Sequence, residues 1–261
     1  MAAERLSGTQ LRDLTRNAAA PGRLTLGETP EGFDALVLAD LARARAEGDS
    51  SGVIHIARDD ARLAATEEAL GFFAPDVEVI SFPAWDCLPY DRVSPAPEIS
   101  SRRMAALSRL ANRKAEGKPF ILLTTVNAAL QRVPEPEMVR RSAWSAHVGN
   151  RIDLEALSAY LAANGYDRTG TVRERGEFAV RGGIVDIFPP GFDAPVRLDM
   201  FGDTLDTVRS FDPESQRTTT TLRGLDLVPA NEIHLDADVI RHFRAAYVAI
   251  FGPATDRDPL Y

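Results

Sequence analysis

The segment GEFAVRGGIVDIFPPGFDAPVRLDMFGDTLDTVRSFDPESQRT, residues Gly176–Thr218, decides the fold of the second half of the chain. Apolar residues alternate with polar ones in four short runs, which begin at Phe178, Ile184, Val196 and Leu205. Alternation with a period of two is typical of half-buried strands, and short glycine-containing turns separate such strands in hairpins. The segment therefore predicts an antiparallel meander with exposed arginines, which suits a recognition surface better than an active site.

Turn and helix signals around the meander complete a small domain. Pro189-Pro190-Gly191 ends one strand, because proline cannot donate to a ladder, and Gly202-Asp203 is expected in a hairpin turn. Upstream, residues 154–164 predict an amphipathic helix with Asp153 as its N-cap and Gly165 at its end. We expect an α+β domain over residues 139–224.

The first half of the chain alternates helices with strands. Helices are expected at 33–47, 59–73, 99–115 and 126–131, and strands at 52–57, 77–82 and 119–124, the first of them buried. This order predicts a parallel sheet covered on both faces, an α/β domain over residues 1–138. A helix over 5–19 and a short strand over 23–26 precede it.

A third segment, residues 225–261, contains an apolar stretch and a helix expected over 236–251. It ends without a closing element, so we expect it to be truncated.

The composition excludes several classes of protein. The net charge of −8 disfavours a bare nucleic-acid-binding module. Cys87 is the only cysteine, which rules out an internal disulfide or a cysteine zinc site and fits a reducing cytosol. Neither a signal peptide nor a run of about 18 apolar residues is present, so we expect a cytoplasmic protein without membrane contact.

A degenerate P-loop precedes the first long helix. Gly27 and Gly32 have P-loop spacing, but Phe33 and Asp34 occupy the places of the lysine that holds phosphates and the hydroxyl residue that binds Mg²⁺. Two glutamates between the glycines add negative charge that repels phosphate. We expect no ATP hydrolysis.

No other catalytic assembly emerges from the sequence. The four histidines lack zinc spacing, and Asp199, Asp203 and Asp206 are interpreted as a solvated face in preference to a metal site.

Four arginines stand close together in this acidic chain: Arg168, Arg173, Arg175 and Arg181. A guanidinium group on a rigid sheet suits recognition of a carboxylate-rich protein face or of phosphate. A solvated strand surface with incidental arginines is the alternative.

The motifs themselves resemble a known family. The run RGGIVDIFPPG from Arg181, and the run RLDMFGDTLDTVRSFDPESQRT over 197–218, resemble the bacterial transcription-repair coupling factors. FPAWDCLPYDRVSP, residues Phe82–Pro95, followed by Ile99-Ser100-Ser101-Arg102, resembles another signature of the family. The repair subunit UvrB shares the first core motif but has a functional P-loop.

The resemblance implies a fold and a role. The fold would be a degenerate RecA-like parallel-sheet domain with an inserted smaller α+β domain, and residues 225–261 would return to complete the first domain. The inserted domain would bind UvrA and recruit it to stalled RNA polymerase. ATP and Mg²⁺ would serve motor domains outside this chain, which would also contact RNA polymerase and DNA. The chain would be a non-catalytic adaptor fragment of an ATP-dependent DNA translocase.

Two other functions remain as alternatives. One is a nucleotide-dependent enzyme domain of the helicase or UvrB type. The other is direct DNA binding by the arginines, which predicts a steep dependence of affinity on salt.

The resemblance also assigns site residues. Arg168, in a Tyr-x-Arg motif, and Arg181 correspond to positions that contact UvrA in UvrB. Ala179 replaces the first arginine of an Arg-x-Arg-Gly motif, and Arg175 is a candidate substitute. Phe188 is either an apolar neighbour of the patch or a core aromatic residue. For the segment 82–95 we expect structural packing, without DNA-damage clamping.

Overall fold

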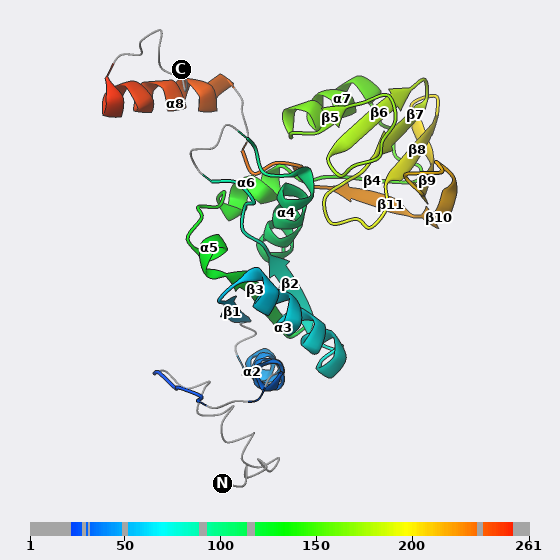
Figure 1. The fold of residues 1–261 in the computed structure, drawn as a ribbon. Helices are drawn as coiled ribbons and strands as arrows, with labels where there is room; N and C mark the ends of the chain where they lie inside the picture. Colours follow the sequence, from blue (N-terminus) through cyan, green and yellow to red (C-terminus); the bar gives the residue numbers. More distant parts are fainter. Residues whose placement is uncertain are drawn as a thin grey trace. The chain divides into compact units, whose positions relative to one another are not determined.

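The computed structural model describes residues 22–27, 30, 32–48, 52–88, 93–113, 118–233 and 237–252. The chain divides into two compact units, residues 1–140 and 141–261 (Figure 1). The helix expected at 5–19 lies outside the described residues, as do the two glutamates of the degenerate P-loop.

The first unit contains the predicted parallel sheet. Its strands are β1 (Val53–Ala57), β2 (Glu78–Phe82) and β3 (Phe120–Thr125), in the order β1-β3-β2. Both β1 and β2 pair with β3 in parallel. The helices of this unit are α2 (Phe33–Gly48), α3 (Asp60–Phe73), α4 (Pro97–Ala111), α5 (Val126–Ala129) and α6 (Pro136–Arg141). The alternation of helices and strands thus gives an α/β class, as expected.

Helices cover both faces of the central strand β3. Ile121 and Leu123 pack against α2 and α3, whereas Phe120 and Leu122 pack in a second cluster with α4. Because successive side chains of a strand point to opposite faces, a continuous apolar run such as FILLT suits a strand that is covered twice.

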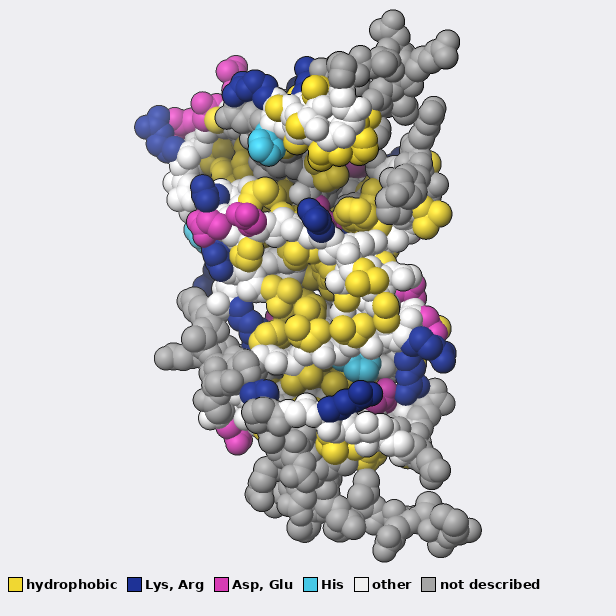
Figure 2. All heavy atoms as spheres, turned by 90° about the vertical axis from the view of Figure 1, so that its left-hand side faces the viewer, with side chains coloured by type: hydrophobic (Ala, Val, Ile, Leu, Met, Phe, Trp, Pro, Cys, Tyr) yellow, Lys and Arg dark blue, Asp and Glu magenta, His cyan; other side chains and the backbone are white. Residues whose placement is uncertain are grey.

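The edge strand β1 is only half covered, so the prediction of a buried strand there was wrong. Ile54 and Ile56 are 66 % and 52 % exposed, while Ala57 of the same strand is buried. Figure 2 shows apolar side chains gathered across the middle of the face where β1 and α5 lie. An apolar sequence alone does not say which strand stands at the edge.

The short strand expected over residues 23–26 does not form. This segment has no regular secondary structure and is exposed, with Leu24 and Leu26 at 49 % and 41 %. A strand needs a neighbour with which to pair, and the three-stranded sheet does not include this segment.

The second unit contains the predicted meander. Its six-stranded sheet has the order β10-β9-β8-β7-β6-β5. The strands are β5 (Asp167–Arg168), β6 (Glu177–Arg181), β7 (Ile184–Ile187), β8 (Val196–Phe201), β9 (Thr204–Phe211) and β10 (Thr218–Leu222). All neighbours are antiparallel except β5 and β6. Gly202, with φ of 64°, lies in the β8–β9 turn, as predicted.

Helix α7 (Leu154–Ala163) covers one face of this sheet. Asp153 caps it by accepting from the backbone N–H groups of Glu155 and Ala156, at 2.9 and 3.1 Å. Gly165 follows the helix with φ of 80°, a conformation that glycine adopts without strain. Leu157 and Leu161 then join the apolar core of the sheet.

The start of the segment that follows the meander packs within the second unit. Strand β11 (Gly224–Leu227) pairs with β4 (Trp144–His147), and Leu225 and Leu227 enter the same core. Helix α8 (Ala237–Phe251) follows, close to the range predicted from the sequence.

Among the helices of the described residues, none is long and apolar enough to cross a bilayer.

Candidate partner-binding face

The six-stranded sheet has one apolar face and one charged face. Val180 and Val185 are paired in register and lie in the core beneath α7. Their neighbours Arg181 and Asp186 therefore lie on the opposite side, because side chains alternate along a strand. We call this opposite side the arginine face, defined by Arg175, Ala179, Arg181, Asp186, Phe188, Arg197, Asp199, Arg209 and Phe211.

Asp186 is the centre of this face. It is fully buried, and it stands opposite Arg197 in the β7–β8 register. Arg197 donates to it from Nε at 2.6 Å and from Nη2 at 2.9 Å, while Arg181 donates from Nη2 to the same carboxylate. The side chain of Arg197 is 18 % exposed and that of Arg181 is 49 % exposed. One buried carboxylate thus joins a mostly buried arginine to a half-exposed one.

The electrostatics of the arginine face follow from these contacts. The hydrogen bond to Asp186 raises the pKa of Arg197. Burial opposes ionisation of Asp199, yet the pKa of Asp199 lies below its usual value because Arg209 and Thr207 donate to the carboxylate. Asp199 is therefore held as an anion on the arginine face.

Arg175 and Phe188 lie together at the end of β7. The guanidinium of Arg175 stands 4.9 Å from the centroid of the Phe188 ring, and its Nε donates to the Phe192 carbonyl at 3.1 Å. Phe188 itself is only 5 % exposed and packs with Val172 and Phe211. Phe188 thus supports the arginine face from beneath.

The structure does not bring all the predicted arginines to one face. Arg168 is exposed on the edge strand β5 and pairs in register with Phe178, whose ring lies in the core beneath α7. Residues paired across strands point to the same side of a sheet, so Arg168 lies on the side opposite to Arg181.

Ala179 lies directly across from Asp186 in the β6–β7 register. It is 1 % exposed, so an arginine at this position would stand beside the buried carboxylate. In this chain Arg197, which lies on the neighbouring strand β8, is the arginine that pairs with Asp186. Sequence reasoning missed both Asp186 and Arg197, because only the strand register brings residues eleven positions apart together.

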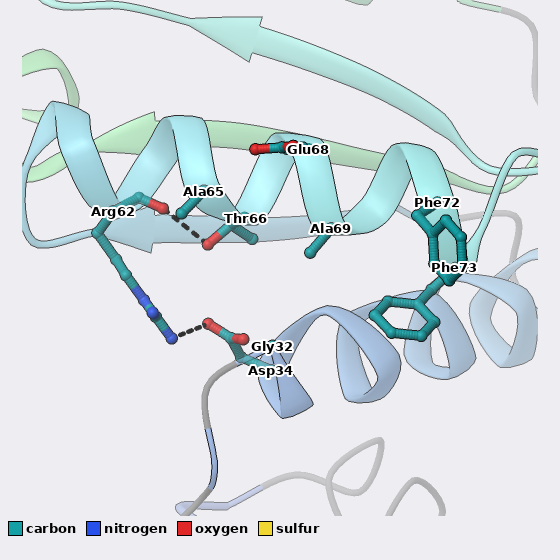
Figure 3. Close-up of a pocket in the computed structure, with 9 residues that line it drawn as sticks. All are labelled: Gly32, Asp34, Arg62, Ala65, Thr66, Glu68, Ala69, Phe72 and Phe73. Carbon is teal, nitrogen blue, oxygen red and sulfur yellow. Dashed lines mark hydrogen bonds and ion pairs between the residues drawn. The ribbon is translucent and has the colours of Figure 1, made fainter.

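The described end of the predicted degenerate P-loop, Gly32 to Asp34, lies at the start of α2. Gly32, with φ of 81°, precedes the helix, and Asp34 accepts from the backbone N–H of Ala35 at 3.1 Å. Arg62 reaches from α3 to Asp34 at 2.8 Å, across a cavity of about 380 Å³ between the two helices (Figure 3). The start of the helix, where a P-loop would hold phosphate, thus carries a paired carboxylate.

His55 lies near this pair. Burial lowers the pKa of His55, and Arg62 adds to the effect while Asp34 opposes it. In the part of the chain that the structure describes, no group of histidine, cysteine or acidic residues is arranged to hold a metal ion.

The segment 82–95 is anchored by a buried arginine. Arg103 is fully buried in α4, and its Nη1 donates to the Pro83 carbonyl at 2.7 Å and to Gln131 Oε1 at 2.8 Å. Its guanidinium stacks 4.1 Å from the Phe82 centroid and 5.2 Å from that of Trp85. Structural packing, as expected, accounts for the start of this segment, whereas residues 89–92 lie outside the described residues.

Comparison with known proteins agrees with the resemblance seen in the sequence. A family model described as the UvrB interaction domain matches residues 145–233, which span β4 to β11 and include the arginine face. The transcription-repair-coupling factor of Haemophilus influenzae is 33 % identical over 234 residues, 90 % of this chain and 20 % of the relative. That of Escherichia coli is 32 % identical over 236 residues, with the same coverage.

A third relative, the transcription-repair-coupling factor of Myxococcus xanthus, is 41 % identical over 158 residues, 60 % of this chain and 13 % of the relative. The chain spans about a fifth of the length of the first two relatives. Residues 145–233 therefore match the UvrB interaction domain, and most of the chain is similar to the N-terminal region of transcription-repair-coupling factors.

Proposed function

We propose that this chain binds UvrA through the arginine face of its second unit. The observation that carries the proposal is the match of a UvrB interaction domain to the unit that holds this face. Arg181 is half exposed and held by a buried carboxylate, which leaves its outer donors available to a partner's acidic side chains. UvrA is the partner that the domain's relationship to UvrB implies.

The role would be that of an adaptor in transcription-coupled nucleotide excision repair. By binding UvrA, the chain would recruit repair to stalled RNA polymerase in the cytoplasm. The rest of the full-length protein would contact RNA polymerase and DNA, and would use ATP and Mg²⁺ to translocate. The relatives that support this role are named as transcription-repair-coupling factors.

We also propose that the degenerate P-loop binds no nucleotide, so that this part of the protein has no catalytic function of its own. Phe33 stands in place of the phosphate-binding lysine, and Asp34 places a carboxylate paired with Arg62 at the start of α2. A phosphate there would meet like charge and would have to displace that pair. Titration with labelled ATP tests this: micromolar binding that a Gly32 substitution abolishes would instead support the helicase-like or UvrB-like enzyme.

The UvrA contact is tested by calorimetric titration of purified UvrA. Arg181→Ala is expected to weaken binding by about tenfold or more, because hydrogen bonds to charged groups contribute about 1.5–3 kcal/mol. Arg168→Ala tests the edge strand β5 in the same way. Arg58→Ala, which removes an exposed arginine from the first unit, is the control and should leave the affinity unchanged. Unchanged affinity for Arg181→Ala, with an unaltered unfolding temperature, contradicts the assignment to the arginine face, and an effect of Arg168→Ala alone would place the contact on the opposite side of the sheet.

The salt dependence of the affinity distinguishes direct DNA binding by the arginines from binding to UvrA. Binding to phosphates weakens steeply as salt rises, because counterions are released. We expect no DNA binding by this chain, and affinity for duplex DNA with a steep salt dependence would overturn that expectation.

A further inference from the structure

We propose that Asp186 is a positioning residue for Arg181, and that Arg197 keeps the pair positively charged towards the partner. The inference rests on the proposed contact of Arg181 with UvrA and deepens it. It assigns roles to two residues that lie mostly or wholly beneath the surface.

The first step is the geometry of the three side chains. Asp186 is fully buried and accepts from both arginines, so its position is fixed by the sheet and by Arg197. Arg197 is fixed in turn, because its guanidinium stacks 4.6 Å from the Phe211 centroid. Arg181 is half exposed, and the contact with Asp186 restricts it to one orientation. A long side chain held in advance loses less conformational entropy when a partner binds.

The second step is the charge. A lone Asp186–Arg181 pair would be neutral and would attract an acidic partner weakly. Two guanidinium groups share the one carboxylate, so the cluster keeps one net positive charge. Since Arg197 is largely buried, that charge is presented to a partner through Arg181.

A double variant separates position from charge. Asp186→Asn with Arg197→Met removes one negative and one positive charge, so the cluster keeps its net charge while Arg181 loses its anchor. Replacing a buried ion pair with neutral groups of similar size is often neutral for stability. We expect binding of UvrA to weaken by about fivefold or more, and Arg181→Ala to have little further effect in this background.

The matched control is Asp199→Asn with Arg209→Met, which removes another aspartate–arginine pair from the arginine face. In this control background, Arg181→Ala should weaken binding as strongly as in the native protein. A merely structural role for Asp186 would leave the effect of Arg181→Ala the same in all three backgrounds. Unfolding temperatures of every variant are measured alongside.

The single variant Asp186→Asn gives a second test, because charge and position predict opposite changes in the affinity for UvrA. Removing a negative charge should tighten binding to an acidic partner if charge alone matters, whereas loss of the anchor should weaken it. Binding that is tighter or unchanged overturns the inference, as does native affinity in the double variant. If Arg181→Ala has no effect in the native protein, the proposed contact fails and this inference fails with it. If Arg181→Ala weakens binding equally in every background, only the inference fails.

Discussion

Removal of Arg103 should strongly disturb the first unit. Its buried guanidinium contacts Pro83, Gln131 and the Phe82 and Trp85 rings. We expect Arg103→Ala to lower the free energy of unfolding by about 3 kcal/mol, because buried acceptors lose a charged donor. Urea unfolding followed by Trp85 fluorescence in a Trp144→Phe background measures this. Arg102→Ala, at an exposed position of the same helix, should change stability by less than about 0.5 kcal/mol. Equal effects of the two substitutions would contradict the anchoring role.

Single residues also mark how far the sequence can be interpreted. Arg181 was predicted from motif and composition, and Asp153 as a helix cap from its place before an apolar helix; the structure confirms the cap. Asp186 and Arg197 were not predicted as site residues, because a polar residue at an alternate strand position gives no sign of what faces it. Their pairing depends on the register between β7 and β8, which is set by packing across the whole sheet.

At the scale of elements, patterns along the chain predicted whether a segment is a helix or a strand better than they predicted how buried or paired that segment is. Most of the predicted helices and strands that lie in the described residues follow their predicted ranges closely, since period and turn residues are local properties, whereas α6, β4, β5 and β10 were not predicted. The segment 52–57 was predicted as a buried strand, yet Ile54 and Ile56 are exposed because β1 stands at the sheet edge. The segment 23–26 forms no strand, since none of the strands in the described part of the chain pairs with it. Both errors concern neighbours that lie far away in sequence.

An ion pair that joins α2 to the turn after α3 should make the stability of the first unit depend on pH. Asp76 accepts from Arg43 Nε at 2.9 Å and from Nη2 at 2.6 Å, and this lowers the pKa of Asp76 to about 2. A carboxyl whose pKa is depressed by folding stabilises the fold above its ordinary pKa of 3.8, and this contribution is lost as pH falls towards 2. Wild type should therefore exceed Asp76→Asn in stability at pH 6, by a margin that shrinks below pH 4.

The control for this pair is Asp60→Asn, which removes an exposed carboxylate from α3. Unfolding midpoints in urea, measured by Trp85 fluorescence at several pH values, report the difference. A margin between wild type and Asp76→Asn that stays constant from pH 6 to pH 2 shows that the pair does not act through ionisation.

At the scale of the whole chain, the two units differ in how their apolar cores are made. The core of the second unit contains residues from β4 to β11, with the helix α7. The clusters around the parallel sheet contain residues from α2, α3 and α4 and their neighbours. In the sequence, the same change appears as a shift from alternating helices and strands to a meander, because each pattern builds its own layer of packing.

Separate cores should unfold as separate steps, and the chain carries a natural reporter of each. Trp85 lies in the first unit and Trp144 in the second, and they are the only tryptophans. Leu161 is fully buried beneath the six-stranded sheet, so Leu161→Ala should destabilise the second unit by about 2–5 kcal/mol. In Trp85→Phe protein this substitution should lower the urea midpoint reported by Trp144, whereas Arg103→Ala should leave that midpoint in place. In Trp144→Phe protein, Arg103→Ala should lower the urea midpoint reported by Trp85, whereas Leu161→Ala should leave that midpoint in place. If each substitution shifts both midpoints equally, the chain unfolds as one cooperative body, and loss of UvrA binding in a variant of one unit could then arise from the other.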